Sequence, residues 1–150
     1  LAREVEYAKG YLTIQKMRYK DKLEFEINVE PSILNIPLIK LVLQPIIENA
    51  IYHGLKYKES KGLLQVKGFM KDGNAVLQVI DNGVGMDEET LAHIYDKHKV
   101  NYHSNGVGVY NVQKRLQLYY GESYGITYES KKGVGTTATI TIPGIQEESI

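Results

Sequence analysis

Two strand-like runs, 63–70 and 74–80, meet at Lys71-Asp72-Gly73, and this junction limits the possible folds more than any other feature of the sequence. Asp-Gly between two such runs is a strong hairpin signal, because both residues accept the positive φ angles of a two-residue turn. Runs 125–130 and 136–142 predict a second hairpin around a glycine-rich turn. Two hairpins in one short chain indicate a sheet that is largely antiparallel.

Residues 23–29 alternate apolar and polar side chains, which adds a strand with one buried face. Helical signals cover residues 3–19, 38–55, 88–95 and 109–120. Pro37 can occupy the first turn of the second of these helices, Pro45 is expected to kink it, and Gly54 is expected to end it. The order of elements predicts an α+β fold, a two-layer sandwich in which helices cover one face of a mixed, mostly antiparallel sheet.

Size and composition exclude several classes of function. A chain of 150 residues is expected to form one core, and its 18 basic and 18 acidic residues cancel, so no long-range field favours nucleic acid or an anionic membrane. Cysteine is absent, which excludes thiol chemistry and fits the cytoplasm. No apolar run approaches the roughly 18 to 20 residues that span a bilayer. The chain begins with Leu1 on a helical pattern, so we expect a cytoplasmic domain cut from a longer protein.

Asp81 ends an apolar strand and is followed by Asn82-Gly83-Val84-Gly85. A carboxylate held at the rim of the core can accept a hydrogen bond from an exocyclic amine such as that of adenine. Gly83 and Gly85 would let the backbone approach a flat ring without an intervening Cβ. The alternative for this segment is an ordinary turn after a strand.

Other residues could hold phosphate or a cation. Gly106-Val107-Gly108-Val109 comes directly before a helix, where free N–H groups receive phosphate oxygens, although the segment could be only a flexible helix start. Asn49 lies within an apolar helix, and its carbonyl oxygen suits Mg²⁺; a core amide bonded to backbone is the alternative. For Glu48 the alternative is a solvated helix face. Thr136 could add a hydrogen bond near Asp81 or simply follow a hairpin turn.

The order of these segments strengthens the functional interpretation of each one. They are Gln44-Pro45-Ile46-Ile47-Glu48-Asn49-Ala50-Ile51-Tyr52-His53-Gly54, then Asp81-Asn82-Gly83-Val84-Gly85-Met86, then Gly106-Val107-Gly108-Val109-Tyr110-Asn111-Val112-Gln113-Lys114-Arg115-Leu116, then Gly133-Val134-Gly135-Thr136. The series resembles the N, G1, G2 and GT boxes of histidine-kinase-type ATPases. The Gln-Pro-x-x-Glu-Asn-Ala-x-x-His-Gly form and the later Asn-Val-x-x-Arg-Leu look most like the LytS/YesM branch of sensor histidine kinases.

The resemblance implies a Bergerat-type ATP site. Asn49 would bind Mg²⁺, Asp81 would bind the adenine amine with support from Thr136, and Glu48 would act on the acceptor imidazole. Further nucleotide contacts would come from His53, Gly83, Gly85, Met86, Gly106, Val107, Gly108 and Val109. Residues 86–105 would form the ATP lid. Tyr52 replaces a lysine frequent in this family, and Tyr110 also departs from the usual pattern.

The resemblance also implies the domain boundaries and the reaction. Residues 1–20 would end the helical segment from a phosphoacceptor region, 21–145 would be the ATPase domain, and 146–150 a frayed tail. The γ-phosphate of ATP would pass to a histidine on an upstream dimerisation helix and then to a cytoplasmic response regulator. The parent protein would be a homodimer in the cell membrane. A non-catalytic nucleotide-binding or docking module is the alternative.

Some residues support weaker hypotheses. An ATP hydrolase of this superfamily would need a carboxylate four residues before Asn49, where this chain has Pro45. His93, His98 and His103 could bind a metal, but their spacing does not put all three on one helical face, so a solvated loop is expected. Lys97 and Lys99 could reach phosphate or remain solvated. The tyrosines near the C-terminus are expected at the edge of the core, without the basic stripe that nucleic acid requires.

Overall fold

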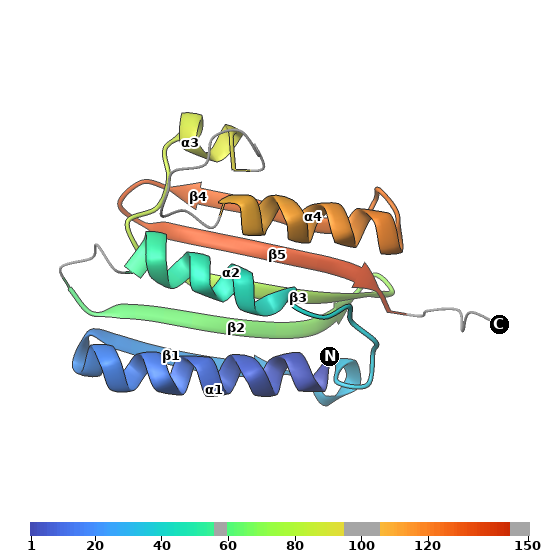
Figure 1. The fold of residues 1–150 in the computed structure, drawn as a ribbon, viewed down its shortest axis with the longest axis horizontal. Helices are drawn as coiled ribbons and strands as arrows, with labels where there is room; N and C mark the ends of the chain where they lie inside the picture. The colour runs from blue at the N-terminus through green and yellow to red at the C-terminus, as the bar shows by residue number, and fades with distance from the viewer. Residues whose placement is uncertain (56–59, 95–105, 145–150) are drawn as a thin grey trace.

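The computed structural model describes residues 1–55, 60–94 and 106–144, and within them five strands form one sheet in the order β1-β2-β3-β5-β4 (Figure 1). The strands are β1 (Leu23–Val29), β2 (Gly62–Lys71), β3 (Asn74–Asp81), β4 (Gly125–Lys131) and β5 (Gly135–Pro143). β1 and β2 are parallel, whereas the other neighbouring pairs are antiparallel. The prediction of a mixed, mostly antiparallel sheet is confirmed.

Both predicted hairpins are present. Lys71 pairs with Asn74 across a two-residue turn in which Asp72 has φ 52° and Gly73 has φ 80°. These positive angles are the reason that Asp-Gly marks such a turn. In the second hairpin Lys131 pairs with Gly135, which brings the ends of β4 and β5 together.

Helices cover one face of the sheet, as Figure 1 shows for α1, α2 and α4. Their bounds are α1 (Ala2–Tyr19), α2 (Leu43–Asn49), α3 (Glu88–Ala92) and α4 (Gly106–Tyr120), and a π-helical segment, Ala50–Leu55, continues α2. The apolar faces of the three covering helices meet the sheet in one core, which includes Leu12, Ile47, Leu77, Leu116 and Ile140. This arrangement is the predicted two-layer sandwich.

The prediction of one helix over 38–55 is wrong at its start. Helix α2 begins at Leu43, because Leu41 has φ 60°, which a right-handed helix does not allow. Pro45 is therefore the third residue of the helix and lies in its first turn, not in its interior. An N–H at that position would have no intrahelical partner, so the proline removes no helical hydrogen bond and causes no kink.

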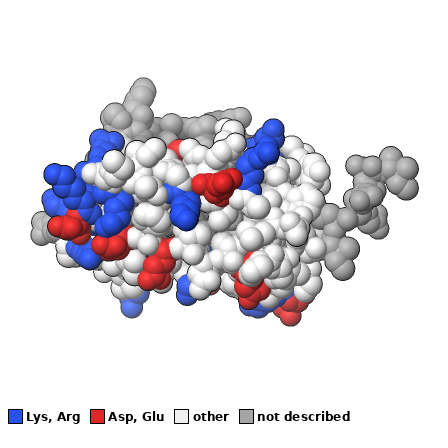
Figure 2. Space-filling view, turned by 90° about the horizontal axis from the view of Figure 1, so that it is seen from below, with Lys and Arg blue, Asp and Glu red and all other residues white. Residues whose placement is uncertain are grey.

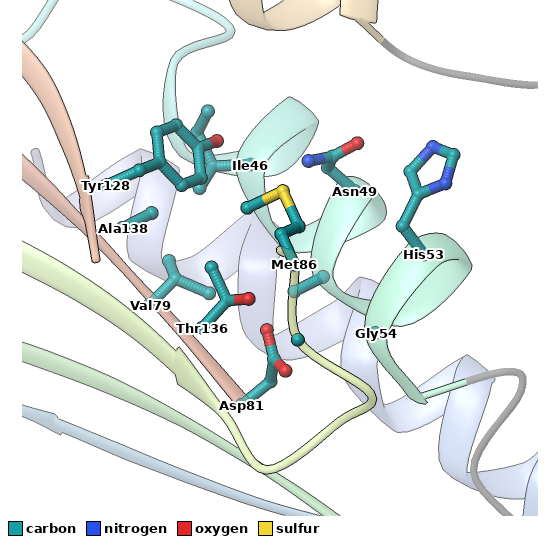
Figure 3. Close-up of a pocket in the computed structure, with 12 residues that line it drawn as sticks. Ile46, Asn49, His53, Gly54, Val79, Asp81, Met86, Tyr128, Thr136 and Ala138 are labelled. Atoms are coloured by element: carbon teal, nitrogen blue, oxygen red, sulfur yellow. The ribbon is translucent and has the colours of Figure 1, made fainter. Parts of the chain in front are cut away.

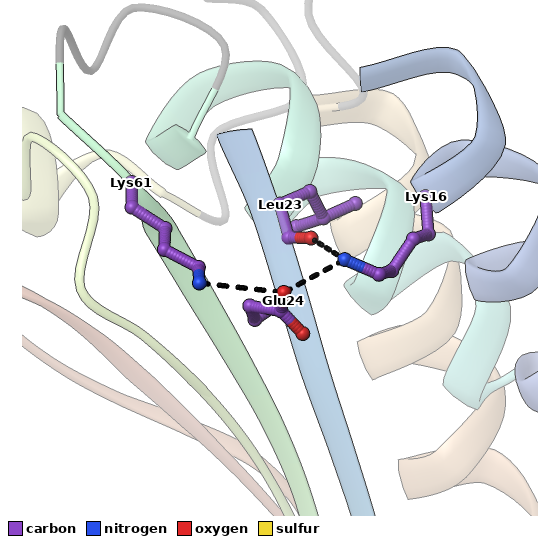
Figure 4. Close-up of polar contacts among 4 residues, drawn as sticks. All are labelled: Lys16, Leu23, Glu24 and Lys61. Atoms are coloured by element: carbon purple, nitrogen blue, oxygen red, sulfur yellow. Dashed lines mark hydrogen bonds and ion pairs between the residues drawn. The ribbon is translucent and has the colours of Figure 1, made fainter. Parts of the chain in front are cut away.

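A small polar cluster joins the end of α1 to the sheet (Figure 4). The Lys16 ammonium donates to the Leu23 carbonyl oxygen and to Glu24 Oε1, both at 2.8 Å, and Lys61 Nζ lies 3.3 Å from the same Glu24 oxygen. The hydrogen bond from Lys16, followed by that from Lys61, lowers the pKa of the Glu24 carboxyl. Exposed ion pairs contribute little stability, so this cluster mainly orients α1 along β1.

The surface carries charges of both signs. On the face shown in Figure 2, acidic and basic side chains are interspersed among uncharged ones, and the basic ones gather toward one end. Among the helices of the described residues, none combines the length and the apolar character that crossing a bilayer requires.

Candidate functional site

Strand alternation turns Asp81 toward the helices. Ala75, Leu77 and Val79 of β3 pack into the helix-covered core, and Asp81 is the next residue of the same period-two series. Thr136 of β5 is its partner in the strand register, so both side chains lie on this face of the sheet. Asp81 is only 6% exposed. A carboxylate thus ends an otherwise apolar row of the core.

Helix α2 and the π-helical segment supply the opposite wall. Ile46, Asn49, Ala50 and His53 recur at i, i+3, i+4 and i+7, the spacing of residues on one helical face. These side chains and the ends of the strands enclose one pocket (Figure 3). Its other lining residues are Gly54, Val79, Asp81, Gly85, Met86, Tyr128, Thr136 and Ala138. Six of the predicted site residues, from three separate segments, therefore line the same pocket: Asn49, His53, Asp81, Gly85, Met86 and Thr136.

Asp81 is held by the loop that follows it and by the end of the π-helical segment. The Gly83 N–H donates to Asp81 Oδ1 at 2.9 Å. A Cβ added to Gly54 would lie 2.8 Å from the same oxygen. Gly54 was predicted to mark the end of the helix, and the helical segment ends one residue later, at Leu55. The structure adds that Gly54 lets this segment approach the carboxylate. Residue type alone does not reveal this contact, because it depends on how helix and sheet pack.

The glycines after Asp81 are required by the packing of the chain itself. A Cβ on Gly83 would lie 2.3 Å from the carbonyl carbon of Gly54. Gly85 has φ 70°, and a Cβ there would lie 2.1 Å from the carbonyl oxygen of Lys131. Gly85 lines the pocket, whereas Gly83 is buried and is not among its lining residues. Both glycines thus have a structural reason that the sequence analysis did not identify.

Ser130 connects the start of the predicted lid to the GT segment. Its hydroxyl oxygen accepts the Met86 N–H at 2.8 Å, and its hydroxyl donates to the Gly135 carbonyl at 3.0 Å. Thr136 Oγ1 lies 2.7 Å from Ser130 Oγ. A serine hydroxyl has one hydrogen, so when Gly135 receives it Thr136 is the donor to Ser130. Sequence reasoning missed Ser130, although the alternation of β4 puts it on the same face as Tyr128, which also lines the pocket.

His53 places a buried nitrogen at the pocket. Within the described part of the chain, its Nε2 is buried and has no hydrogen-bond partner. Burial lowers the pKa of the imidazole, so the neutral form is favoured. The Tyr52 ring packs edge to face against it, with centroids 5.0 Å apart. A buried polar atom without a partner is unfavourable, and a polar group of a bound ligand would satisfy it.

The glycine segment expected before a helix is instead the first turn of that helix. Helix α4 begins at Gly106, so residues 106–109 supply the N–H groups that have no intrahelical partner. The Val109 side chain is fully buried in the core, which leaves only its backbone to meet a ligand. Gly108 lines a separate groove with Pro45 and Arg115. Within the described part of the chain, neither Gly108 nor Val109 lines the pocket of Asp81.

Glu48 also lies apart from that pocket. Successive helical residues diverge by about 100°, so Glu48 and Asn49 face different directions. Glu48 Oε1 accepts a hydrogen bond from Gln44 Nε2 at 3.0 Å. Its charge adds to burial in raising the pKa of Tyr11 on α1, which indicates that the carboxylate faces α1. The prediction grouped Glu48 with Asn49 at one site, and the structure separates them.

The pocket offers one amide oxygen, that of Asn49, as a ligand for a cation. Over residues 1–55, 60–94 and 106–144, no three His, Asp or Glu side chains lie close enough together to hold a metal ion. Mg²⁺ usually takes only one or two protein ligands and completes its shell with phosphates and water. The Asn49 amide can supply such a ligand, and Figure 3 shows it beside the pocket.

Several predictions concern residues outside the described ranges. His93 is exposed at the end of α3. His98, His103, Lys97 and Lys99 lie outside the described residues, as do the rest of the predicted lid, 95–105, and the tail, 145–150. The metal and phosphate hypotheses for these side chains therefore remain predictions.

Residues 35–146 match the family described as histidine kinase-, DNA gyrase B- and HSP90-like ATPase. The chain is 31% identical over 140 residues to the sensor histidine kinase YesM of Bacillus subtilis. The aligned region covers 93% of this chain and 23% of YesM. It is 35% identical over 124 residues to the sensor protein LytS of Oceanobacillus iheyensis, covering 81% of this chain and 21% of LytS. The chain thus spans less than a quarter of the length of either relative.

Solved structures share the fold. The catalytic domain of the histidine kinase ThkA superposes with a TM-score of 0.69 at 16% identity, covering 95% of this chain and 91% of that domain. The blue-light activated histidine kinase of Erythrobacter litoralis gives 0.66 at 17% identity, covering 92% of this chain and 41% of that one. At these identities the similarity concerns the fold alone.

Proposed function

The chain belongs to the histidine kinase-, DNA gyrase B- and HSP90-like ATPase family as an ATP-binding catalytic domain of the LytS/YesM sensor kinase type, and from this premise we propose that it transfers the ATP γ-phosphate to a histidine outside the chain. One observation carries the proposal. Residues predicted for nucleotide binding from three distant segments line one pocket between helix and sheet, and His53 Nε2 is a buried nitrogen there without a partner among the described residues.

Adenine recognition is assigned to Asp81. Its carboxylate is nearly buried and already accepts the Gly83 N–H, which fixes its orientation. A fixed carboxylate accepts a hydrogen bond from the adenine amine and disfavours guanine, which presents a carbonyl oxygen at that position. Thr136 uses its hydroxyl hydrogen toward Ser130, so it supports Asp81 through a water that donates to both side chains, and the backbone around Gly83 and Gly85 lies by the ring. Met86 adds an apolar contact.

Phosphate binding is assigned to Asn49, His53 and the first turn of α4. The N–H groups of Gly106, Val107, Gly108 and Val109, which have no intrahelical partner, and the positive end of the helix dipole would face phosphate oxygens. Asn49 would hold Mg²⁺ together with the phosphates, and the ion would supply neutralisation of their negative charge. Tyr52 provides no charge where related chains often have lysine, so we expect weaker phosphate binding than in those chains.

The transfer step requires little covalent chemistry from this chain. A neutral imidazole nitrogen of the acceptor histidine attacks the γ-phosphorus in line, the bond to the β–γ bridging oxygen breaks, and ADP leaves with that electron pair. The chain contributes by positioning the phosphate and by stabilising charge. Glu48 would take the proton that the imidazole loses, and its position toward α1 suits an acceptor that approaches from outside the pocket.

The remaining parts of the proposal concern the whole protein. The acceptor histidine would lie on an upstream dimerisation helix, the parent protein would be a membrane-anchored homodimer, and this domain would work in the cytoplasm. The phosphate would pass from the histidine to an aspartate of a response regulator. The names of the relatives, a sensor histidine kinase and a sensor protein, support this setting.

A transfer assay tests the proposal. The chain is mixed with Mg-ATP and a separately prepared upstream helix that carries the acceptor histidine, and acid-labile phosphate on that helix is measured. We expect labelling that requires the chain and is lost in Asp81→Asn. Nucleotide binding without labelling would favour a non-catalytic docking module, and absence of nucleotide binding would refute the assignment of the pocket.

A further inference from the structure

The loop before α2 holds a strained residue on the surface. Leu41 has φ 60°, a left-handed conformation that side chains with a Cβ rarely adopt, and its side chain is 59% exposed. Its burial therefore does not offset the strain. Such conformations persist only where surrounding groups determine them, and they concentrate at functional sites.

Two charged side chains from different helices fix this loop. The Arg115 guanidinium of α4 donates to the carbonyl oxygens of Lys40 at 2.7 Å and Leu41 at 2.6 Å. The Glu4 carboxylate of α1 accepts the N–H groups of Leu41 at 2.7 Å and Leu43 at 3.1 Å. Leu43 is the first residue of α2, so Glu4 also caps that helix. Arg115 and Glu4 thus each form hydrogen bonds with two backbone atoms of the segment 40–43.

Residues 40–43 connect to both helical parts of the proposed nucleotide site, because they lead directly into α2 and are bonded by Arg115 of α4. Helix α2 and its continuation carry Asn49 and His53 into the pocket, and α4 begins with the N–H groups assigned to phosphate. Leu41, Gly108 and Arg115 line one groove, which places the loop directly beside the first turn of α4. The position of residues 40–43 therefore sets how α2 lies relative to the start of α4.

We propose that Glu4 and Arg115 are positioning residues, which act through Leu41 to keep α2 and the first turn of α4 at the spacing that Mg-ATP requires. The proposal rests on the proposed function, because it concerns the same nucleotide site. Without Arg115 two carbonyls lose their donor, Leu41 relaxes to an ordinary backbone conformation, and α2 is free to shift. A binding site tolerates only a fraction of an ångström of such movement. Through Glu4, a displacement of α1 alters nucleotide affinity.

Nucleotide affinity of the 150-residue chain tests this role, measured by calorimetric titration with Mg-ATP well below the midpoint of thermal unfolding. We expect Arg115→Met to weaken binding by roughly tenfold, within the usual range of coupling between sites. Arg115→Lys should recover part of the loss, because an ammonium can reach one carbonyl but not hold both in a fork. The control Lys67→Met removes an exposed charge on β2 that lines neither the pocket nor the groove, and it should stay within about twofold of the unmodified chain.

Variants of α1 complete the test. Glu4→Gln should weaken binding in the same direction as Arg115→Met, whereas Glu6→Gln, an exposed residue on the same helix, should not. The double variant Glu4→Gln/Arg115→Met should lose less than the product of the single losses, because both act through one loop. Should Arg115→Met fail to fold, Arg115→Lys and Glu4→Gln carry the comparison.

The outcomes separate the two proposals. If the unmodified chain binds Mg-ATP and the Arg115 and Glu4 variants bind it equally well while their unfolding midpoints fall, the two residues are purely structural and the positioning role is refuted. If the unmodified chain does not bind Mg-ATP, the proposed function is refuted, and the positioning role with it.

Discussion

Gly83 has no room for a side chain, because a Cβ there would lie 2.3 Å from the carbonyl carbon of Gly54. The obstacle is backbone, which cannot rotate away as a flexible side chain can. Gly83→Ala should therefore lower the free energy of unfolding by about 1 to 3 kcal/mol, the usual cost of overpacking. Urea denaturation measures the change.

Gly10 is the matched control for that substitution. It lies within α1, and a Cβ there would meet nothing within 4 Å. Gly10→Ala should raise the free energy of unfolding by about 0.5 to 1 kcal/mol, since alanine has the higher helix propensity. Equal stability of the two variants would contradict the close approach of Gly83 to Gly54.

His53 makes stability depend on pH. Burial lowers the pKa of its imidazole in the folded state below the ordinary value of 6.5, so the unfolded chain binds a proton more readily. The contribution of His53 is complete above pH 6.5 and is lost as the pH falls from 6.5 through the lower folded pKa. When the pH falls from 7.5 to 5.5, the free energy of unfolding should therefore decrease more in the unmodified chain than in His53→Gln.

The comparison with His53→Gln isolates the contribution of this one imidazole to the pH dependence. If His53→Gln keeps the full pH dependence of the unmodified chain, the imidazole is not the group that burial holds neutral.

Among the elements, the start of α2 distinguishes the observed fold from the predicted one. Pro45 lies in the first turn, where its missing N–H removes no helical hydrogen bond. Pro45→Ala should lower the free energy of unfolding by no more than about 1 kcal/mol, through the greater freedom of the unfolded chain. Proline in a helix interior costs about 3 kcal/mol. If Pro45→Ala raised the free energy of unfolding by about 2 kcal/mol or more, the result would support the continuous, kinked helix.

The elements that the sequence predicted correctly are those with local signals. Alternation placed β1 at 23–29, and Asp72-Gly73 placed the β2–β3 turn. The start of α2 lacked such a signal, because the conformation of Leu41 depends on Glu4 and Arg115, which are 37 and 74 residues away. Nor does sequence distinguish a glycine pair before a helix from one in its first turn, so residues 106–109 were misplaced.

The pocket could be predicted only in part for the same reason. Asn49 and Asp81 were found because polar residues in apolar segments are conspicuous, and Thr136 because it follows a glycine turn. Ser130 and Tyr128 were missed, since their roles come from the pairing of β4 with β5. Gly54 matters through a contact between two layers, which no local pattern reveals.

For the whole molecule, the pocket joins elements that are distant in the sequence, so nucleotide binding and folding are linked. Asn49 and His53 come from the helical layer, and Asp81 and Thr136 come from the sheet. A ligand that binds only the folded chain stabilises it by about 2.7 kcal/mol at one hundred times its dissociation constant. Separation of the layers would break the site, which makes nucleotide binding a measure of the intact fold.

Titration with Mg-ATP and Mg-GTP, compared between the unmodified chain and Asp81→Asn, tests the assignment of this pocket most directly. The asparagine can still accept the Gly83 N–H, so the fold should persist, as circular dichroism can verify. We predict saturable binding of ATP in preference to GTP, and a loss of ATP affinity of about tenfold to a hundredfold in Asp81→Asn, as expected for a hydrogen bond to a charged group. Equal ATP affinity in the two chains, or no binding of ATP to the unmodified chain, would contradict the account.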